Sequence, residues 1–194
     1  MPDGRTLGAR DDVVAAVGHV PARIAVAGVS GSGKTTLGRR VADRLGLPHT
    51  EIDALFHGPG WTPRETFLDD VRAVLAQPAW VTEWQYREAK PLILERVELL
   101  VWLDLPTPVA MQQVIRRTLR RRLGRQGLWN GNQEPPLRTF FTDDEHIVRW
   151  AWSTRNTLRS LDERLAREAP HVVVVRLRTR GQVEDWFQRL PRAV

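Results

Sequence analysis

The sequence predicts an α/β protein, in which a five-stranded parallel sheet carries helices on both faces. Alternation of apolar segments with helical patterns is typical of such sheets, and the apolar segments recur at 23–27, 48–52, 79–83, 99–104 and 171–177. A chain of 194 residues can bury one substantial core but is short for two. We therefore expect a single domain over 23–194, preceded by an N-terminal tail over 1–22.

The first strand leads directly into a glycine-rich run, Gly28-Val29-Ser30-Gly31-Ser32-Gly33-Lys34-Thr35. The residues that follow predict a helix ending at Gly46, because apolar side chains recur four residues apart at Leu37, Val41 and Leu45. A strand, a loop of this pattern and a helix together form a P-loop, or Walker A motif, which binds the phosphates of a nucleotide. The sequence therefore predicts a nucleotide-binding protein.

Each residue type in the P-loop has a separate role in phosphate binding. Glycine permits unusual backbone angles and lets main-chain N–H groups approach the phosphates, where the helix N-terminus adds positive charge. Lys34 is expected to bridge the β- and γ-phosphates, and Thr35 to place its hydroxyl on Mg²⁺. The expected cofactors are ATP and Mg²⁺, and the expected nucleotide-binding residues are Gly28, Ser30, Gly31, Ser32, Gly33, Lys34, Thr35 and Thr36.

The middle of the chain continues the alternation. A helix is expected to start at Thr62, since Pro63 suits a first helical turn, and Pro78 ends it before the third strand. Another helix is expected from Thr107, after the fourth strand. In open parallel sheets ligands bind beyond the carboxyl ends of the strands, so functional residues are expected just after each strand.

A lid is expected between the fourth and fifth strands, over about 117–142. Residues 124–136 are rich in Gly, Asn, Gln and Pro without any periodicity, which is typical of a long connection. Beyond it, apolar residues on one stripe predict a long helix that begins at Asp143 or Asp144 and extends past Leu165.

The composition narrows the class of protein. The chain has no cysteine, which excludes disulfides and thiolate metal sites. Neither a secretory signal nor a run of membrane-spanning length is present, so we expect a cytoplasmic protein without membrane contact. The net charge is +6, and this surplus fits nucleic-acid binding, phosphate handling or a compositional bias. It is concentrated in the run Arg116, Arg117, Arg120, Arg121, Arg122 and Arg125.

Three stretches outside the P-loop resemble the adenylate-kinase-like family of small P-loop kinases, and look most like its topology-modulation-protein branch. They are Ile52-Asp53-Ala54-Leu55-Phe56 with Pro59-Gly60-Trp61, Trp80-Val81-Thr82-Glu83-Trp84-Gln85-Tyr86-Arg87, and Val101-Trp102-Leu103-Asp104-Leu105-Pro106. The resemblance runs from about residue 23 to 190. It implies a three-layer P-loop NTPase fold with strand order 2-3-1-4-5, an Arg-rich lid, and transfer of phosphate from ATP to a small acceptor.

Acidic residues follow three of the expected strands. Asp53 is expected to orient the acceptor hydroxyl or a metal-bound water, and Glu83 to act as a base or second metal contact. Asp104 closes an apolar strand as a Walker B aspartate does, where it would hold Mg²⁺. A helix cap or turn acid remains the alternative for Asp53, and hydrogen bonds to P-loop side chains remain the alternative for Asp104.

The resemblance also implies roles for arginines and aromatic residues. Arg117 and Arg121 would stack on the base and close over the γ-phosphate, although a solvated charged helix face is the alternative for such a run. Arg87 and Arg155 would bind phosphates, and Tyr86 would line the acceptor pocket. Trp84 departs from the branch, which has a small glycine there, and a bulky side chain at that position would block a nucleotide acceptor.

Three functions are consistent with these residues. The leading prediction is an ATP-dependent phosphotransferase that acts on a nucleotide, a nucleoside or another small molecule. An ATP-binding regulator or nucleic-acid-associated protein is the alternative, and its binding to nucleic acid would weaken steeply with salt. A slow NTPase, or an enzyme that uses ATP on a macromolecule, is the third. Paired strand-end acids and a lid favour the kinase, because a regulator needs no acceptor carboxylate.

Overall fold

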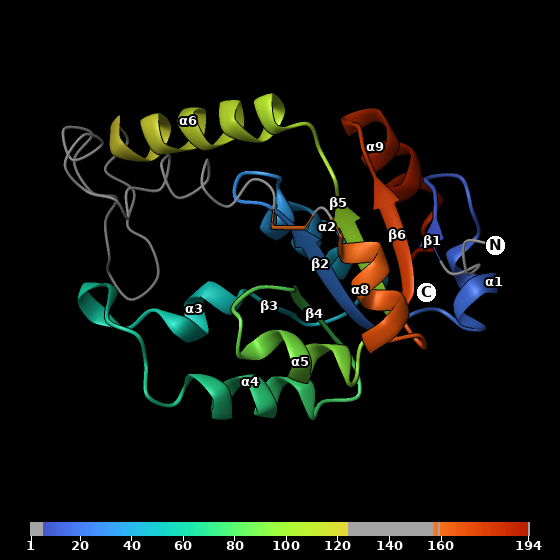
Figure 1. Cartoon of the computed structure of the whole chain (residues 1–194), viewed down its shortest axis with the longest axis horizontal. Helices are drawn as coiled ribbons and strands as arrows, with labels where there is room; N and C mark the ends of the chain where they lie inside the picture. The colour runs from blue at the N-terminus through green and yellow to red at the C-terminus, as the bar shows by residue number, and fades with distance from the viewer. Residues whose placement is uncertain (1–5, 124–156, 159, 194) are drawn as a thin grey trace.

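The computed structural model describes residues 6–123, 157–158 and 160–193, with side chains as far as Arg116 in helix α6. The elements, in chain order, are β1 (Thr6–Leu7), α1 (Val13–Val17), β2 (Arg23–Gly28), α2 (Lys34–Leu45), β3 (His49–Thr50), α3 (Ile52–Phe56), the 3₁₀ turn η1 (Pro59–Trp61), α4 (Phe67–Leu75), β4 (Trp80–Glu83), α5 (Ala89–Leu94), β5 (Leu99–Leu103), α6 (Thr107–Leu123), α8 (Leu161–Glu168), β6 (Val173–Leu177) and α9 (Arg180–Arg189). Figure 1 shows the strands side by side at the centre, with helices around them.

A parallel sheet of six strands forms the centre of the molecule, in the order β1-β6-β5-β2-β4-β3. The prediction of a parallel sheet is confirmed, and five of its strands lie in the predicted order. The predicted count of five is wrong, because β1 in the expected tail pairs with β6 through Thr6 and Leu7. A strand of two residues is too short to show the alternating pattern of a strand, so β1 could not be predicted from the sequence.

The predicted limits of one strand and two helices also need correction. The second strand is only His49–Thr50, and the next residues turn into α3. Helix α4 begins at Phe67 rather than Thr62. Helix α8 begins at Leu161 rather than at Asp143 or Asp144. The described residues just before it, 157–158 and 160, lie in turns. Asp162 and Glu163 in its first turn favour a helix start there, because acidic side chains stabilise helix N-termini.

Two hydrophobic clusters make the sheet the middle layer of three. Strand β5 is buried along its whole length and contributes to both clusters: Leu100 and Trp102 to one, Leu99, Val101 and Leu103 to the other. The first cluster lies under α3, α4, α5 and α8, and the second under α1, α2 and α9. The prediction of helices on both faces is therefore confirmed. In the part of the chain that the structure describes, no helix is long and apolar enough to cross a membrane.

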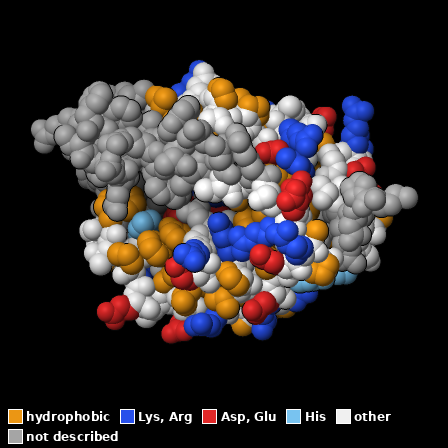
Figure 2. Space-filling model, in the orientation of Figure 1, with side chains coloured by type: hydrophobic (Ala, Val, Ile, Leu, Met, Phe, Trp, Pro, Cys, Tyr) orange, Lys and Arg blue, Asp and Glu red, His pale blue; other side chains and the backbone are white. Residues whose placement is uncertain are grey.

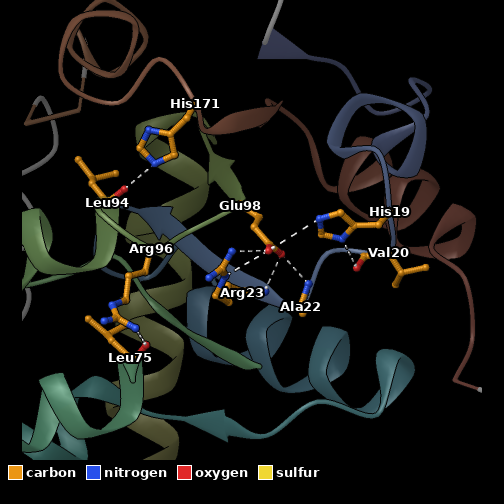
Figure 3. A network of polar contacts seen from close by, with 9 residues as sticks. All are labelled: His19, Val20, Ala22, Arg23, Leu75, Leu94, Arg96, Glu98 and His171. Carbon is orange, nitrogen blue, oxygen red and sulfur yellow. Dashed lines mark hydrogen bonds and ion pairs between the residues drawn. The ribbon is translucent and has the colours of Figure 1, made fainter. Parts of the chain in front are cut away.

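A polar network ties the amino ends of β2 and β5 together (Figure 3). Oε2 of Glu98 accepts the backbone N–H groups of Ala22 at 2.8 Å and Arg23 at 3.1 Å, and Oε1 accepts the Arg23 guanidinium at 2.7 and 3.1 Å. Burial opposes ionisation of Glu98, but these donors outweigh it and lower the pKa of its carboxyl group. The network lies at the opposite end of β2 from the P-loop, so its role is in stability.

We expect Glu98→Gln to lower the free energy of unfolding by about 1.5–3 kcal/mol, the range for hydrogen bonds to a charged group. Because the folded protein lowers this pKa, the carboxylate stabilises the fold above the pKa of the unfolded chain. That contribution is lost as the pH falls through the folded pKa. Urea unfolding from pH 7 to pH 3 checks this: the difference between wild type and variant should shrink in acid. A difference that stays constant with pH would contradict it.

Candidate active site

The P-loop follows β2 and ends where α2 begins. Helix α2 starts at Lys34, with Gly33 before it in a left-handed conformation at φ 97°. The backbone N–H of Ser32 donates to the carbonyl of Val29 at 3.1 Å, which closes the turn of the loop. Lys34 Nζ lies 3.4 Å from the same carbonyl, so its side chain folds over the loop. These residues place backbone N–H groups and one ammonium at a helix N-terminus, as phosphate binding requires.

Helix α6 packs directly against the P-loop at Gly31. This glycine has φ 77°, and a Cβ built on it would collide with Val114 Cγ2 and lie 2.5 Å from the Ala110 carbonyl. Only glycine fits there, because both the backbone angle and the neighbouring helix exclude a side chain. The helix that carries the predicted lid arginines is thus seated on the phosphate loop.

We expect Gly31→Ala to weaken binding of Mg-ATP by about 5- to 150-fold, corresponding to the 1–3 kcal/mol typical of strained backbone. The added methyl group would displace the loop or α6. Gly60→Ala is the matched control, since Gly60 has a similar φ of 66° but no atom within 4 Å of its Cβ position. Calorimetric titration of both variants compares them. Equal affinities would contradict the proposed packing of α6 on the loop.

Glu83 is buried at the end of β4. In the sheet it is the register partner of Val26 on β2, the strand that leads into the P-loop. Its Oε2 accepts the N–H of Ile52 at 2.9 Å, and its Oε1 is 4.0 Å from Nε2 of His49. Burial raises the pKa of Glu83, and the Ile52 N–H, the Thr35 hydroxyl and Lys34 offset part of this rise. The structure therefore brings together a carboxylate and the two P-loop side chains predicted to meet Mg²⁺ and the γ-phosphate.

Asp53 stands in the first turn of α3 with one carboxylate oxygen held by two donors. Oδ1 accepts the side-chain amide of Gln85 at 2.8 Å and the hydroxyl of Tyr86 at 2.7 Å. Oδ2 accepts no hydrogen bond within the described residues. This arrangement fixes the plane of the carboxylate and leaves its second oxygen open to a ligand.

Tyr86 is itself fixed by packing and by an unusual backbone conformation. Its φ is 60°, rare for a residue with a bulky side chain. Its ring stacks on Phe56 with 4.2 Å between centroids and meets Phe67 edge-on at 5.2 Å. Its hydroxyl also lies 3.3 Å from Nε2 of His57. Burial and the neighbouring Asp53 raise the pKa of Tyr86, so the phenol stays protonated and donates to Asp53.

We expect Tyr86→Phe to lower turnover of the candidate site by about tenfold, because one donor to Asp53 is lost, worth about 1.5 kcal/mol for a charged acceptor. Steady-state kinetics with saturating Mg-ATP and acceptor measure the loss. Turnover equal to that of the wild type would argue against a role of Tyr86 in holding Asp53.

Asp104 follows β5 and is engaged by arginines. Oδ2 accepts Nε of Arg176 at 2.9 Å, and NH2 of the same guanidinium lies 2.8 Å away. Arg178 adds a longer ion pair at 3.7 Å. The carboxylate thus faces β6, and its predicted contact with Mg²⁺ stays a prediction. Arg176 also pairs with Asp162 at 2.8 Å, so it connects β5, β6 and α8.

The predicted arginine sites are only partly described. Arg87 is exposed beside Tyr86 and makes no hydrogen bond or ion pair within the described residues. Arg117 and Arg121 lie on α6, but their side chains fall outside the description, as do Arg155 and most of the expected lid. Trp84 does not obstruct the site: its side chain is 3% exposed in the core cluster under α5 and α8.

Metal binding at this site would depend on the nucleotide. The described residues contain no group of three or more His, Asp or Glu side chains that could hold a metal ion by themselves. The hydroxyl of Thr35 and the carboxylate of Glu83 are hard oxygen donors, which suit Mg²⁺. Mg²⁺ commonly binds through one or two such groups together with substrate phosphates, so these residues fit Mg-ATP.

Solved structures of small-molecule kinases share this architecture. A gluconokinase from Sinorhizobium meliloti matches with a TM-score of 0.51 and 21% identity, over 88% of this chain and 90% of that one. A shikimate kinase from Acinetobacter baumannii, solved in complex with shikimate, matches with a TM-score of 0.50 and 18% identity, over 87% and 89%. The chain has the small P-loop kinase fold. No protein-family model and no curated protein matches the sequence.

Within this P-loop kinase fold, several residues of the site had no signal in the sequence. Gln85 lies in one of the stretches that carry the family resemblance, but nothing in the sequence indicated its contact with Asp53. His49 belongs to no recognisable motif, and its position near Glu83 also required the structure. Arg176 lies near the end of the apolar strand β6. A charged residue at such a position indicates a polar contact only weakly. Chain spacing alone does not show which side chains meet across a sheet, so these partners required the structure.

Proposed function

We propose that the protein is an ATP-dependent kinase that transfers the γ-phosphate of Mg-ATP to a hydroxyl group of a small acceptor. The observation that carries this proposal is the carboxylate of Asp53, at the same edge of the sheet as the P-loop. One of its oxygens is held by two hydrogen bonds, and the other accepts none within the described residues. An acid held in this way orients a hydroxyl nucleophile, which is the main task of the protein in phosphoryl transfer. A protein that only binds ATP has no need of it.

The proposed reaction divides into binding and proton transfer. The P-loop N–H groups and Lys34 would hold the β- and γ-phosphates and neutralise the charge that develops on the transferred group. Thr35 and Glu83 would hold Mg²⁺, directly or through water, and the metal supplies further charge neutralisation on the phosphates. Oδ2 of Asp53 would accept the proton of the acceptor hydroxyl as that oxygen attacks phosphorus.

The surroundings of Asp53 support a small-molecule acceptor. His57, Trp61 and Tyr86 form an aromatic group next to the carboxylate, with ring centroids 5.0 Å apart for His57 and Trp61 and 6.4 Å for His57 and Tyr86. Aromatic side chains of this kind pack against flat or apolar parts of a ligand. Arg87 on the rim would meet an anionic group. The topology-modulation branch suggested by the sequence stays a prediction.

ADP release from Mg-ATP tests the proposal, with nucleosides, nucleoside monophosphates and small hydroxylated acids supplied in turn. We expect one class to stimulate release and to gain a phosphate. ATP binding without stimulation by any acceptor would favour the regulatory or nucleic-acid-associated alternative. In that case a gel shift that weakens with salt would identify nucleic acid as the partner.

A further inference from the structure

Two cations from different helices share one tryptophan ring next to the candidate site. Lys90 Nζ on α5 lies 4.6 Å from the centroid of the Trp84 ring, and the guanidinium carbon of Arg164 on α8 lies 5.6 Å from it. The indole N–H of Trp84 donates to the Lys90 carbonyl at 3.3 Å, which fixes the ring relative to α5. We call Trp84, Lys90 and Arg164 the cation cluster.

Within the described residues, the cation cluster has one anionic partner, Glu168, and that partner contacts Arg164 alone. Lys90 is half-buried, and its ammonium makes no ion pair or hydrogen bond within the described residues. Glu168 is bound to Arg164 at 2.7 Å, and Glu88, close to Lys90 in sequence, is exposed. Burial lowers the pKa of Lys90, and the charge of Arg164 lowers it further. A lysine is rarely buried without an anionic partner, and a second cation beside it adds to the cost.

The cluster is connected to the acceptor side of the candidate site. The backbone N–H of Lys90 donates to the carbonyl of Tyr86 at 3.0 Å, and the hydroxyl of Tyr86 holds Asp53. Figure 2 shows a band of Lys and Arg side chains across the middle of this face, in front of the sheet and between α5 and α8. Arg87, three residues before Lys90, is a further cation in this segment and is exposed.

We propose that Lys90 and Arg164, held on Trp84, bind an oxyanion carried by the acceptor, a carboxylate or a phosphate. This proposal rests on the proposed kinase function for the identity of the ligand. A compact ammonium and a planar guanidinium together complement the oxygens of such a group, and desolvation beside the indole strengthens the attraction. The acceptor would then be an anionic hydroxyl compound, bound at one end by the cluster and at the other by Asp53.

The chain offers a direct probe of the cluster, because Lys34 and Lys90 are its only lysines. Protein labelled with ¹³C at lysine Cε gives two side-chain signals in an NMR spectrum, and Lys90→Gln assigns them. The P-loop is first filled with a non-hydrolysable Mg-ATP analogue, and inorganic phosphate or acetate is then added at constant ionic strength. We expect the Lys90 signal to shift saturably with one of these anions, which names the group that the cluster binds.

Matched variants decide whether the cluster is responsible. Arg164→Gln should weaken the anion affinity read at Lys90 by about tenfold, corresponding to one hydrogen bond to a charged group. Arg167→Gln, which removes the same charge from an exposed position of α8, should leave it unchanged. A Lys90 signal that moves with neither anion, or equal effects of the two variants, would overturn the proposal. The Lys34 signal reports nucleotide binding separately, so failure of the kinase proposal would be recognised independently.

Discussion

Lys34→Ala is expected to lower turnover by about 10²–10³-fold, the loss typical of removing one preorganised group that stabilises transition-state charge. The ammonium of Lys34 folds over the P-loop and contributes to the electrostatic environment of Glu83. Its proposed task is to neutralise the γ-phosphate as that group is transferred. Steady-state kinetics with saturating acceptor measure the loss.

The matched control for Lys34→Ala is Arg167→Ala, because Arg167 lies at an exposed position of α8 away from the candidate site. It removes the same charge and should have turnover close to wild type. Thermal unfolding of both variants checks that the fold is intact. Full turnover in Lys34→Ala with an intact fold would contradict the assigned role of the P-loop.

Asp53→Asn is expected to lower turnover by about 10²–10⁴-fold, the usual contribution of a general base. The amide oxygen of asparagine can still accept the hydrogen bonds of Gln85 and Tyr86, so the geometry of the network is preserved. The amide nitrogen cannot accept the proton of the acceptor hydroxyl. The loss should therefore appear in kcat much more than in the KM for the acceptor.

Asp69→Asn is the control for this change, since the side chain of Asp69 is 81% exposed and its one ion pair within the described residues is with Arg72 at 2.8 Å. It should have turnover close to wild type. If Asp53→Asn retained wild-type kcat, Asp53 would be a structural acid of helix α3. That result would remove the observation on which the kinase proposal depends.

The residues that follow a strong local rule were predictable from the sequence. The P-loop is a contiguous motif with a required backbone conformation, and its strand and helix were located correctly. Strand β5 is a continuous apolar run, which is the expected pattern for a strand buried on both faces. Asp53 and Glu83 could be proposed as site residues because the carboxyl ends of parallel strands share one edge of the sheet.

The features that depend on contacts between distant segments were not predictable. Strand β1 is two residues long and forms only because β6 offers it an edge. The partners of Asp53 come from a loop more than thirty positions away, at Gln85 and Tyr86. Trp84 was expected to block a nucleotide acceptor, but its side chain turns into the core. Periodicity indicates burial within an element, and it does not show the direction of a single side chain in a loop.

Transfer of the terminal phosphate of ATP to a small molecule is the central claim, and mass spectrometry tests it most directly. The protein would be incubated with Mg-ATP labelled with ¹⁸O in the γ-phosphate and with a mixture of anionic hydroxyl compounds, nucleosides and nucleoside monophosphates. We predict one product that carries the labelled phosphoryl group, formed by the wild type and absent with Asp53→Asn. Labelled inorganic phosphate as the sole product, in equal amounts with both proteins, would contradict the account.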